Sequence, residues 1–312
     1  MKKLSLLCLV TLVSLGLYLL WDMNYDIFDY VIRKRMEKVV AMMIVGVSIG
    51  LSTLTFQSIT NNRILTPSIL GLDSLYLMMQ LLTVTMFSSM ASLLNNPYLN
   101  FFIAAALLTL VASLIYKWVF LRSSSMYFMV LVGIVMGTMF SSINGMLQIM
   151  ISPDVYNLVM DKMFANFSIV NEKLILVSLI INGLVMVQLV RKRYLMDTLS
   201  LGRDYSINLG VDYDREVLKL LLPVFVLVSV STALVGPVTF LGFFAANMAR
   251  VVLKTYKHTY LYIGTCMVGV SVLLIGQFFI EHLFDFGLPI SVLISMIGGT
   301  YFIYMLMKEN KR

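Results

Sequence analysis

The chain has 312 residues, of which 60% are hydrophobic and 12% are charged, and its formal net charge is +7. A mean hydropathy of +0.91 is more than a soluble domain of this length can bury, so the composition excludes the soluble protein classes and favours a bilayer as solvent. The positive charge does not require nucleic acid as a partner, because basic residues of a membrane protein face the anionic leaflet.

Long runs without charged residues predict an all-α membrane protein of about ten spanning helices, since no alternation typical of a β-barrel is present. Turn signals at Asn96-Pro97 and Gly236-Pro237 divide two of the runs. The eighth helix is short enough to cross only part of the membrane. The expected helices cover residues 3–21, 36–60, 69–94, 99–119, 125–151, 173–191, 216–235, 239–251, 259–281 and 288–307.

The first run resembles a secretory signal, because Lys2 and Lys3 precede an apolar stretch. The stretch is longer than a usual signal core, and no small-x-small cleavage pattern follows before Trp21, so we interpret it as a retained first helix. Cys8 and Cys266 both fall inside expected helices. Neither a disulfide framework nor a metal-ligand spacing can be built from them, and no metal site or other cofactor is expected.

The distribution of basic residues predicts the orientation of the chain. With the N-terminus in the cytoplasm, most of the 23 Lys and Arg residues lie inside. Those left outside are Arg33, Lys34, Arg35, Lys38, Lys162 and Lys173. We therefore expect an even number of spans in the cell membrane, with both termini cytoplasmic and membrane lipids around them.

Polar residues form one stripe on each of two expected helices. Ser48, Ser52 and Thr55 recur at helical spacing in the second helix, and Ser141, Asn144 and Gln148 do so in the fifth. Such stripes line a passage between two subunits in one interpretation and form hydrogen bonds between helices in the other, which is the commoner use. The pairs Gly46–Gly50 and Gly133–Gly137 on these helices favour close packing.

The segment 192–216, expected in the cytoplasm, carries spaced apolar residues and two glycines. A loop of this kind folds into short helices that dock on another protein and transmit a rigid-body motion. The alternative is a solvated loop whose leucines rest on the membrane surface.

The chain lacks several features that enzymes and self-powered carriers need. No P-loop sequence for ATP is present, and no nucleophile–base arrangement stands out. The spans are almost free of the ionisable groups that intramembrane chemistry or a proton relay requires. A facilitator, a scaffold or a permease driven by a separate motor remains.

The segment 199–211 then resembles a known motif. Its residues resemble the pattern L-x-L-G-x-x-x-A-x-x-L-G-V of the iron-chelate and vitamin B12 importer permeases, with Ser206 at the position of the alanine. The residues are Leu199, Leu201, Gly202, Ser206, Leu209, Gly210 and Val211. In that family the motif binds the ATPase subunit. The resemblance implies the fold of the vitamin B12 importer permease and an ATPase-coupling role for these seven residues.

Three further blocks follow the family patterns in order, from the second helix to the C-terminus. The first is similar to R-x-P-R…G…S-G…Q…N-P-L-A-x-P-x-L-L-G, the second to G-P-x-x-F-x-G-x-x-x-P-H-x-x-R, and the third to L-P-x-G…G. The residues that carry them are Arg35, Lys38, Gly46, Ser52, Gln57, Asn62, Pro67, Leu70 and Gly71; Gly236 to Gly242 with Arg250; and Leu288, Pro289, Ile290 and Gly298.

The sequence also departs from these patterns, which puts the local helix geometry near residues 63 and 246 in doubt. The departing residues are Glu37, Thr53, Arg63, Ala246, Asn247 and Ser291. The resemblance implies that Arg35 and Lys38 accept acidic side chains of a binding protein, where opposite charges steer encounter. The alternative is that they anchor a helix end at the lipid headgroups.

The composition and the helices predict a single transmembrane domain over residues 1–312, and the family resemblance implies that it is a permease that carries a ferric siderophore into the cytoplasm. The expected partners are ABC ATPase subunits, a substrate-binding lipoprotein and a second permease subunit, with no nucleic acid. The same resemblance leaves vitamin B12 or haem as alternative cargoes. A facilitator or scaffold working without ATP is the alternative of another class.

Overall fold

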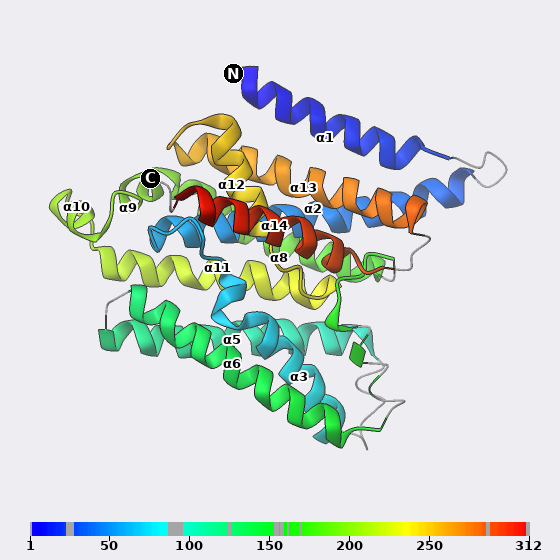
Figure 1. The fold of residues 1–312 in the computed structure, drawn as a ribbon, viewed down its shortest axis with the longest axis horizontal. Coiled ribbons are helices and arrows are strands. Elements are labelled where there is room, and N and C mark those ends of the chain that lie inside the picture. The colour runs from blue at the N-terminus through cyan, green and yellow to red at the C-terminus, as the bar shows by residue number, and fades with distance from the viewer. Residues whose placement is uncertain are drawn as a thin grey trace.

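The computed structural model describes residues 2–22, 28–86, 96–123, 126–152, 156, 159–160, 162–168, 170–284 and 288–309, and no strand occurs among them. The helices, drawn in Figure 1, are α1 (Lys2–Leu20), α2 (Phe28–Ile59), the 3₁₀ turn η2 (Pro67–Leu70), α3 (Leu72–Met86), α5 (Pro97–Ser123), α6 (Met126–Met150), α8 (Glu172–Arg191), α9 (Arg193–Leu199), α10 (Arg203–Asn208), α11 (Tyr213–Val235), α12 (Leu241–Leu253), α13 (His258–Leu283) and α14 (Ile290–Glu309).

The expected all-α membrane architecture is confirmed. Within the described parts of the chain, eight helices are long and apolar enough to cross a bilayer: α1, α2, α5, α6, α8, α11, α13 and α14. The two other expected spans correspond to shorter helices. α12 has 13 residues, as its short apolar run predicted, and α3 has 15. The last part of the expected span 69–94 lies outside the described residues.

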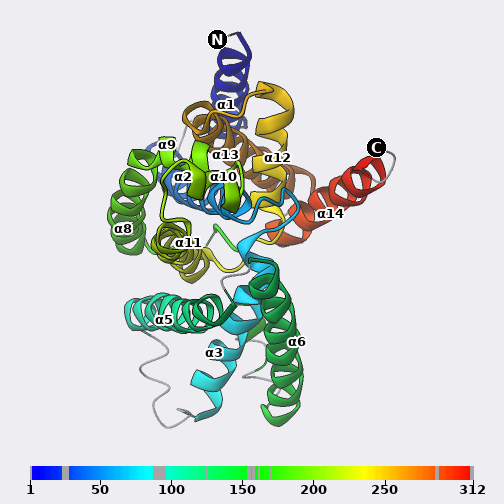
Figure 2. The same ribbon diagram turned by 90° about the vertical axis from the view of Figure 1, so that its left-hand side faces the viewer.

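Helices α2, α11 and α13 form the buried centre, whereas α1, α6 and α14 are mostly exposed on the outside of the chain. Figures 1 and 2 show α11 between α2 and a lower group made of α3, α5 and α6. A side chain at Gly46 would meet the backbone of Gly269 and Val270 at 2.9–3.1 Å. The glycine therefore lets α2 and α13 approach at backbone distance, as the small-residue pair predicted.

Two glycines set the breaks between consecutive helices. Gly71 has φ +79°, which turns the chain from η2 into α3, and its Cα packs directly on Gly137 of α6. Gly236 has φ +100° and, with Pro237 behind it, ends α11 before α12 begins. Both positions need a positive φ that a side chain disfavours, so a turn rather than a continuous helix forms at each.

The second helix begins earlier than expected, at Phe28 instead of residue 36. The first turns of α2 carry charged residues, and the expected helix left them out because it was based on the apolar run alone. These residues pair along the helix: Arg33 and Lys34 both contact Glu37, and both also reach Glu172 at the start of α8. Ion pairs at helical spacing therefore extend α2 beyond its apolar part.

Candidate functional site

Helices α9 and α10 form a compact unit at one end of the bundle (Figure 1). The segment 192–216 thus contains two short helices, as the docking interpretation expected. Gly202, with φ +102°, and Gly210, with φ +83°, turn the chain before and after α10. A residue other than glycine is strained at such angles, which explains both glycines in the segment.

Two of the seven expected coupling residues are fully buried, and a third, Val211, is half-buried against the main hydrophobic cluster. Leu199 is fully buried and packs with Met196 in the main hydrophobic cluster. Ser206 is also buried, and its hydroxyl donates to the carbonyl oxygens of Thr198 at 3.0 Å and Gly202 at 2.7 Å. This serine therefore fastens α10 to α9. The Val211 N–H donates to the Ser206 carbonyl at 3.0 Å and closes the unit.

The other face of the unit presents apolar side chains outward. Leu201 is 56% exposed and Leu209 is 63% exposed, and Tyr205 and Ile207 are exposed beside them. An exposed apolar group of this kind, held on a rigid support, is typical of an interaction surface. The arrangement fits the docking interpretation, because the leucines project from a closed helical unit.

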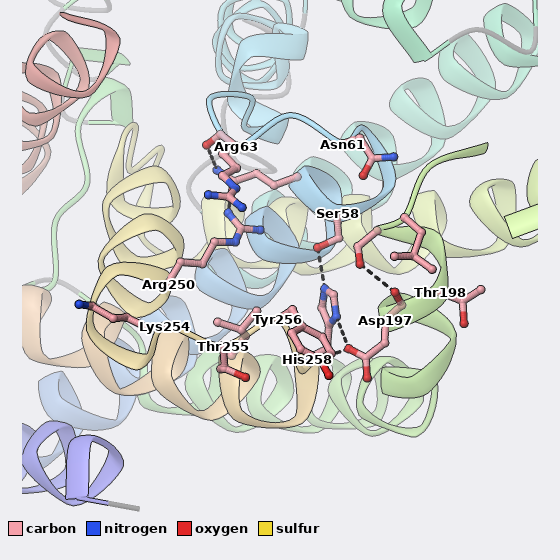
Figure 3. Close-up of a pocket in the computed structure, with 14 residues that line it drawn as sticks. Ser58, Asn61, Arg63, Asp197, Thr198, Arg250, Lys254, Thr255, Tyr256 and His258 are labelled. Atoms are coloured by element: carbon pink, nitrogen blue, oxygen red, sulfur yellow. Dashed lines mark hydrogen bonds and ion pairs between the residues drawn. The ribbon is translucent and has the colours of Figure 1, made fainter. Parts of the chain in front are cut away.

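The unit is anchored to the bundle by a chain of three side chains (Figure 3). Asp197 of α9 accepts hydrogen bonds from the backbone N–H of His258 at 2.7 Å and from its ring Nδ1 at 2.7 Å. The ring Nε2 lies 2.7 Å from Ser58 Oγ on α2. A carboxylate only accepts hydrogen bonds, so Nδ1 carries a proton.

The order serine, histidine, aspartate is also that of hydrolytic enzymes, but the arrangement here is structural. Ser58 is buried, and its hydroxyl also reaches the Leu54 carbonyl at 2.8 Å. A nucleophile needs an oxygen that substrate can approach. The chain of bonds instead joins α9, α13 and α2. Sequence reasoning missed it, because Asp197 and His258 are 61 residues apart and neither carries a motif.

Two of the family-like blocks meet next to this anchor. Arg250 of α12 donates through Nη1 to Gln57 Oε1 of α2. Gln57 in turn donates through Nε2 to the Arg63 carbonyl at 2.7 Å. Asn247, which stands at one of the departures from the family pattern, donates to the same carbonyl at 3.0 Å. The departing residues near 63 and 247 are therefore joined to each other.

The two residues expected to meet a binding protein lie at the opposite end of α2 and have internal partners. Arg35 donates through Nη1 to the carbonyls of Leu19 at 3.0 Å and Trp21 at 2.7 Å, at the negative end of the α1 dipole. Lys38 Nζ lies 2.8 Å from Glu281 Oε1 of α13. Both cations thus hold helices together, and their docking role stays a prediction.

The polar stripe on α2 faces the interior of the chain. Ser48, Ser52 and Thr55 are all fully buried. Ser52 donates to the Ile49 carbonyl at 2.9 Å, and Thr55 Oγ1 lies 3.3 Å from the Tyr262 hydroxyl on α13. This placement fits the interhelical alternative, and the pathway role of the stripe stays a prediction.

The stripe on α6 is divided between the interior and the surface. Ser141 is exposed and its Oγ lies 2.9 Å from Ser74 Oγ of α3. Asn144 is buried and donates to the Ser74 carbonyl at 2.9 Å, and Gln148 is half-buried. Ser141 and Gln148 are thus the residues of the two stripes with exposed surface, and a passage-lining role remains a prediction for them.

In the described part of the chain no cluster of three His, Cys, Asp or Glu residues suits a metal.

The comparison with protein families matches residues 5–308 to the FecCD transport family. The chain belongs to the FecCD transport family. Among curated relatives, it is 44% identical over 310 residues to the petrobactin import system permease protein YclO of Bacillus subtilis, which covers 99% of this chain and 98% of the relative. It is 31% identical over 320 residues to the petrobactin import system permease protein FatC of Bacillus anthracis, covering 97% and 88% of the two chains.

Solved structures agree on the fold. A metal-chelate type ABC transporter in an inward-facing conformation superposes with a TM-score of 0.85 at 20% identity, over 98% of this chain and 99% of that one. PsaBC of Streptococcus pneumoniae gives a TM-score of 0.61 at 14% identity, over 87% and 90% of the two chains. Membership of the FecCD family confirms the resemblance of the four sequence blocks and assigns the chain as a membrane transport permease subunit.

Proposed function

We propose that this chain is the permease subunit of an ABC importer that moves a ferric siderophore of the petrobactin type into the cytoplasm. The observation that carries the proposal is the 44% identity to a petrobactin import permease over almost the full length of both chains. A second petrobactin permease at 31% identity supports the same cargo.

The energy comes from ATP hydrolysed by separate ATPase subunits in this proposal. Support comes from α9 and α10, whose outward leucines 201 and 209 offer an apolar contact, while Asp197 and Ser206 hold the unit rigidly on the bundle. Motion applied there reaches α13 and α2 directly through His258 and Ser58. A second permease subunit and an extracytoplasmic binding lipoprotein complete the importer.

We further propose that both termini face the cytoplasm together with the coupling unit. The N- and C-termini and the helices α9 and α10 lie at the same end of the bundle in Figure 1. Basic residues also gather at this end, among them Arg193, Arg203 and Lys254, as the positive-inside rule requires of the cytoplasmic side.

Uptake of ⁵⁵Fe-petrobactin by a deletion strain and by the same strain carrying the gene tests the cargo. We expect uptake to be lost on deletion and restored by the gene. Normal uptake without the gene would rule out the proposal. Labelled vitamin B12 and haem, offered to the same strains, test the alternative cargoes.

An ATPase-dead variant of the partner ATPase distinguishes the importer from a facilitator. Accumulation of labelled iron against its gradient stops in that strain if the chain is driven by ATP. Downhill entry that continues unchanged would instead support the facilitator.

A further inference from the structure

Two adjacent cavities at the coupling end share a wall of arginines. The larger, about 820 Å³, lies between the end of α2, the helix α9 and the connection from α12 to α13 (Figure 3). The smaller, about 340 Å³, lies between α12 and α14. Arg63 and Arg250 line both cavities.

The charges around these cavities are mostly positive. Lys254 adds a cation to the larger cavity and Lys308 adds one to the smaller. None of these four cations forms an ion pair with an acidic group of the described residues. Asp197 is the acidic residue that lines the larger cavity, and its oxygen Oδ1 accepts both bonds from His258.

Arg63 and Arg250 direct their guanidinium groups toward the same region (Figure 3). Arg250 uses one nitrogen for Gln57, and the remaining donors of the two groups have no hydrogen bond within the described chain. Two like charges in a partly enclosed place repel each other and are stabilised by an anion between them. Guanidinium groups suit phosphate in particular, because their planar donors bind two of its oxygens at once.

The smaller cavity also has apolar and aromatic walls. Val251 of α12 and Tyr304 of α14 are exposed, and Tyr301 and Met305 continue the lining along α14. Tyrosines near the end of a span lie at the depth of lipid headgroups, where apolar positions next to them contact acyl chains. A basic pocket between spanning helices on the cytoplasmic side is a setting in which anionic lipid headgroups bind.

We propose that Arg63 and Arg250, assisted by Lys308, form a binding site for a phosphate group, with an anionic phospholipid as its source. The lipid phosphate lies on the two guanidinium groups, and its acyl chains run along the exposed faces of α12 and α14. The site adjoins the coupling unit, because Leu201 also lines the larger cavity, but its cations are not part of the apolar coupling surface. It links the lipid to α2 through the chain from Arg250 to Gln57.

The test uses the full chain in nanodiscs of phosphatidylcholine, with or without phosphatidylglycerol. Native mass spectrometry measures how much phosphatidylglycerol the protein retains after release. We expect the Arg63→Gln variant to retain it with roughly tenfold lower affinity, as losing one charge-assisted hydrogen bond implies. Lys257→Gln removes an exposed lysine of the same end that lines neither cavity, and it serves as the matched control.

A second arm separates the lipid from free phosphate. Inorganic phosphate is titrated onto the protein in pure phosphatidylcholine, and the unfolding midpoint is followed. Stabilisation by phosphate that Arg63→Gln abolishes, without retention of phosphatidylglycerol, assigns the site to free phosphate. Absence of both effects, or an equal loss in Lys257→Gln, overturns the proposal.

Folding of the variant is checked in the same discs without phosphate. The Arg63 side chain is exposed, and the bonds from Gln57 and Asn247 go to its backbone carbonyl, so Arg63→Gln keeps them. Should this variant nevertheless unfold, Lys308→Gln takes its place, with the same expected loss of lipid and the same control.

Discussion

At the scale of single residues, Glu281 holds the end of the bundle opposite the coupling unit. Its carboxylate oxygen Oε1 accepts from Lys38 at 2.8 Å, from Tyr18 at 3.0 Å and from Gln277 at 2.9 Å. The Glu281 side chain is only 8% exposed. A charge in such a place is costly when its charged partner is removed, because the remaining ion stays buried with hydrogen-bond donors but without an opposite charge.

Lys38→Ala is therefore expected to lower the free energy of unfolding by about 3 kcal/mol. Lys34→Ala, which removes a far more exposed lysine of the same helix, should cost less than about 1 kcal/mol. Denaturant unfolding in detergent measures both. The reversed pair, Lys38→Glu with Glu281→Lys, is expected to recover part of the loss. Equal losses for Lys34 and Lys38 would show that the pair does not stabilise the fold.

Asp197→Ala tests the anchor of the coupling unit. The change leaves the backbone N–H and the ring Nδ1 of buried His258 without their acceptor, at a cost of about 1–3 kcal/mol. A lower midpoint of thermal unfolding reports the loss. Asp204→Ala, at an exposed aspartate of α10, is the control and should leave the midpoint nearly unchanged. No difference between the two variants would mean that the anchor carries no stability.

At the scale of elements, α9 and α10 separate the residues that stabilise the unit from those that face outward. Leu199 and Ser206 are buried, whereas Leu201 and Leu209 are exposed. Substitutions on the two sides therefore have different consequences. Inward changes affect folding of the unit, and outward changes affect what docks on it.

Leu201→Asp and Leu209→Asp are expected to abolish co-purification with the ATPase subunits. The unfolding midpoint should stay within about 1 °C of that of the unaltered chain, because these exposed side chains contribute little to the stability of the fold. Tyr127→Asp, at an exposed aromatic of α6, is the control and should keep the complex. An intact complex in both leucine variants would remove the coupling assignment.

The contact between α2 and α13 depends on a glycine in the same direct way. A side chain at Gly46 overlaps the backbone of Gly269 and Val270, which cannot move aside cheaply. We expect Gly46→Val to cost about 1–3 kcal/mol of stability or to prevent folding. Gly183→Val is the matched control, because nothing lies within 4 Å of a side chain there. Yield and unfolding midpoint in detergent compare the two, and an equal loss would contradict the close-contact interpretation.

At the scale of the whole molecule, hydrophobicity predicts the helices well because burial in lipid depends on each segment alone. Helix α13 begins and ends within two residues of the expected span 259–281. The contacts between helices were not predictable in this way. Gln57 and Arg250 lie 193 residues apart, and each is compatible with many partners. The same limit applies to Lys38, because its ion pair with Glu281 could not be predicted from the sequence; its docking role, implied by the family resemblance, stays a prediction.

The orientation of the whole chain is open to a direct test. Cys8 and Cys266 are first replaced by alanine, and single cysteines are introduced by Tyr256→Cys at the coupling end and Lys173→Cys at the opposite end, both exposed positions. A membrane-impermeant maleimide on intact cells is expected to label Lys173→Cys alone, and permeabilised cells should show both labelled. The expectation follows from the bias of basic residues toward the coupling end, which opposes their transfer across the membrane during insertion. Labelling of Tyr256→Cys in intact cells would place the coupling unit outside, where no ATPase can reach it, and would overturn the importer proposal together with the orientation.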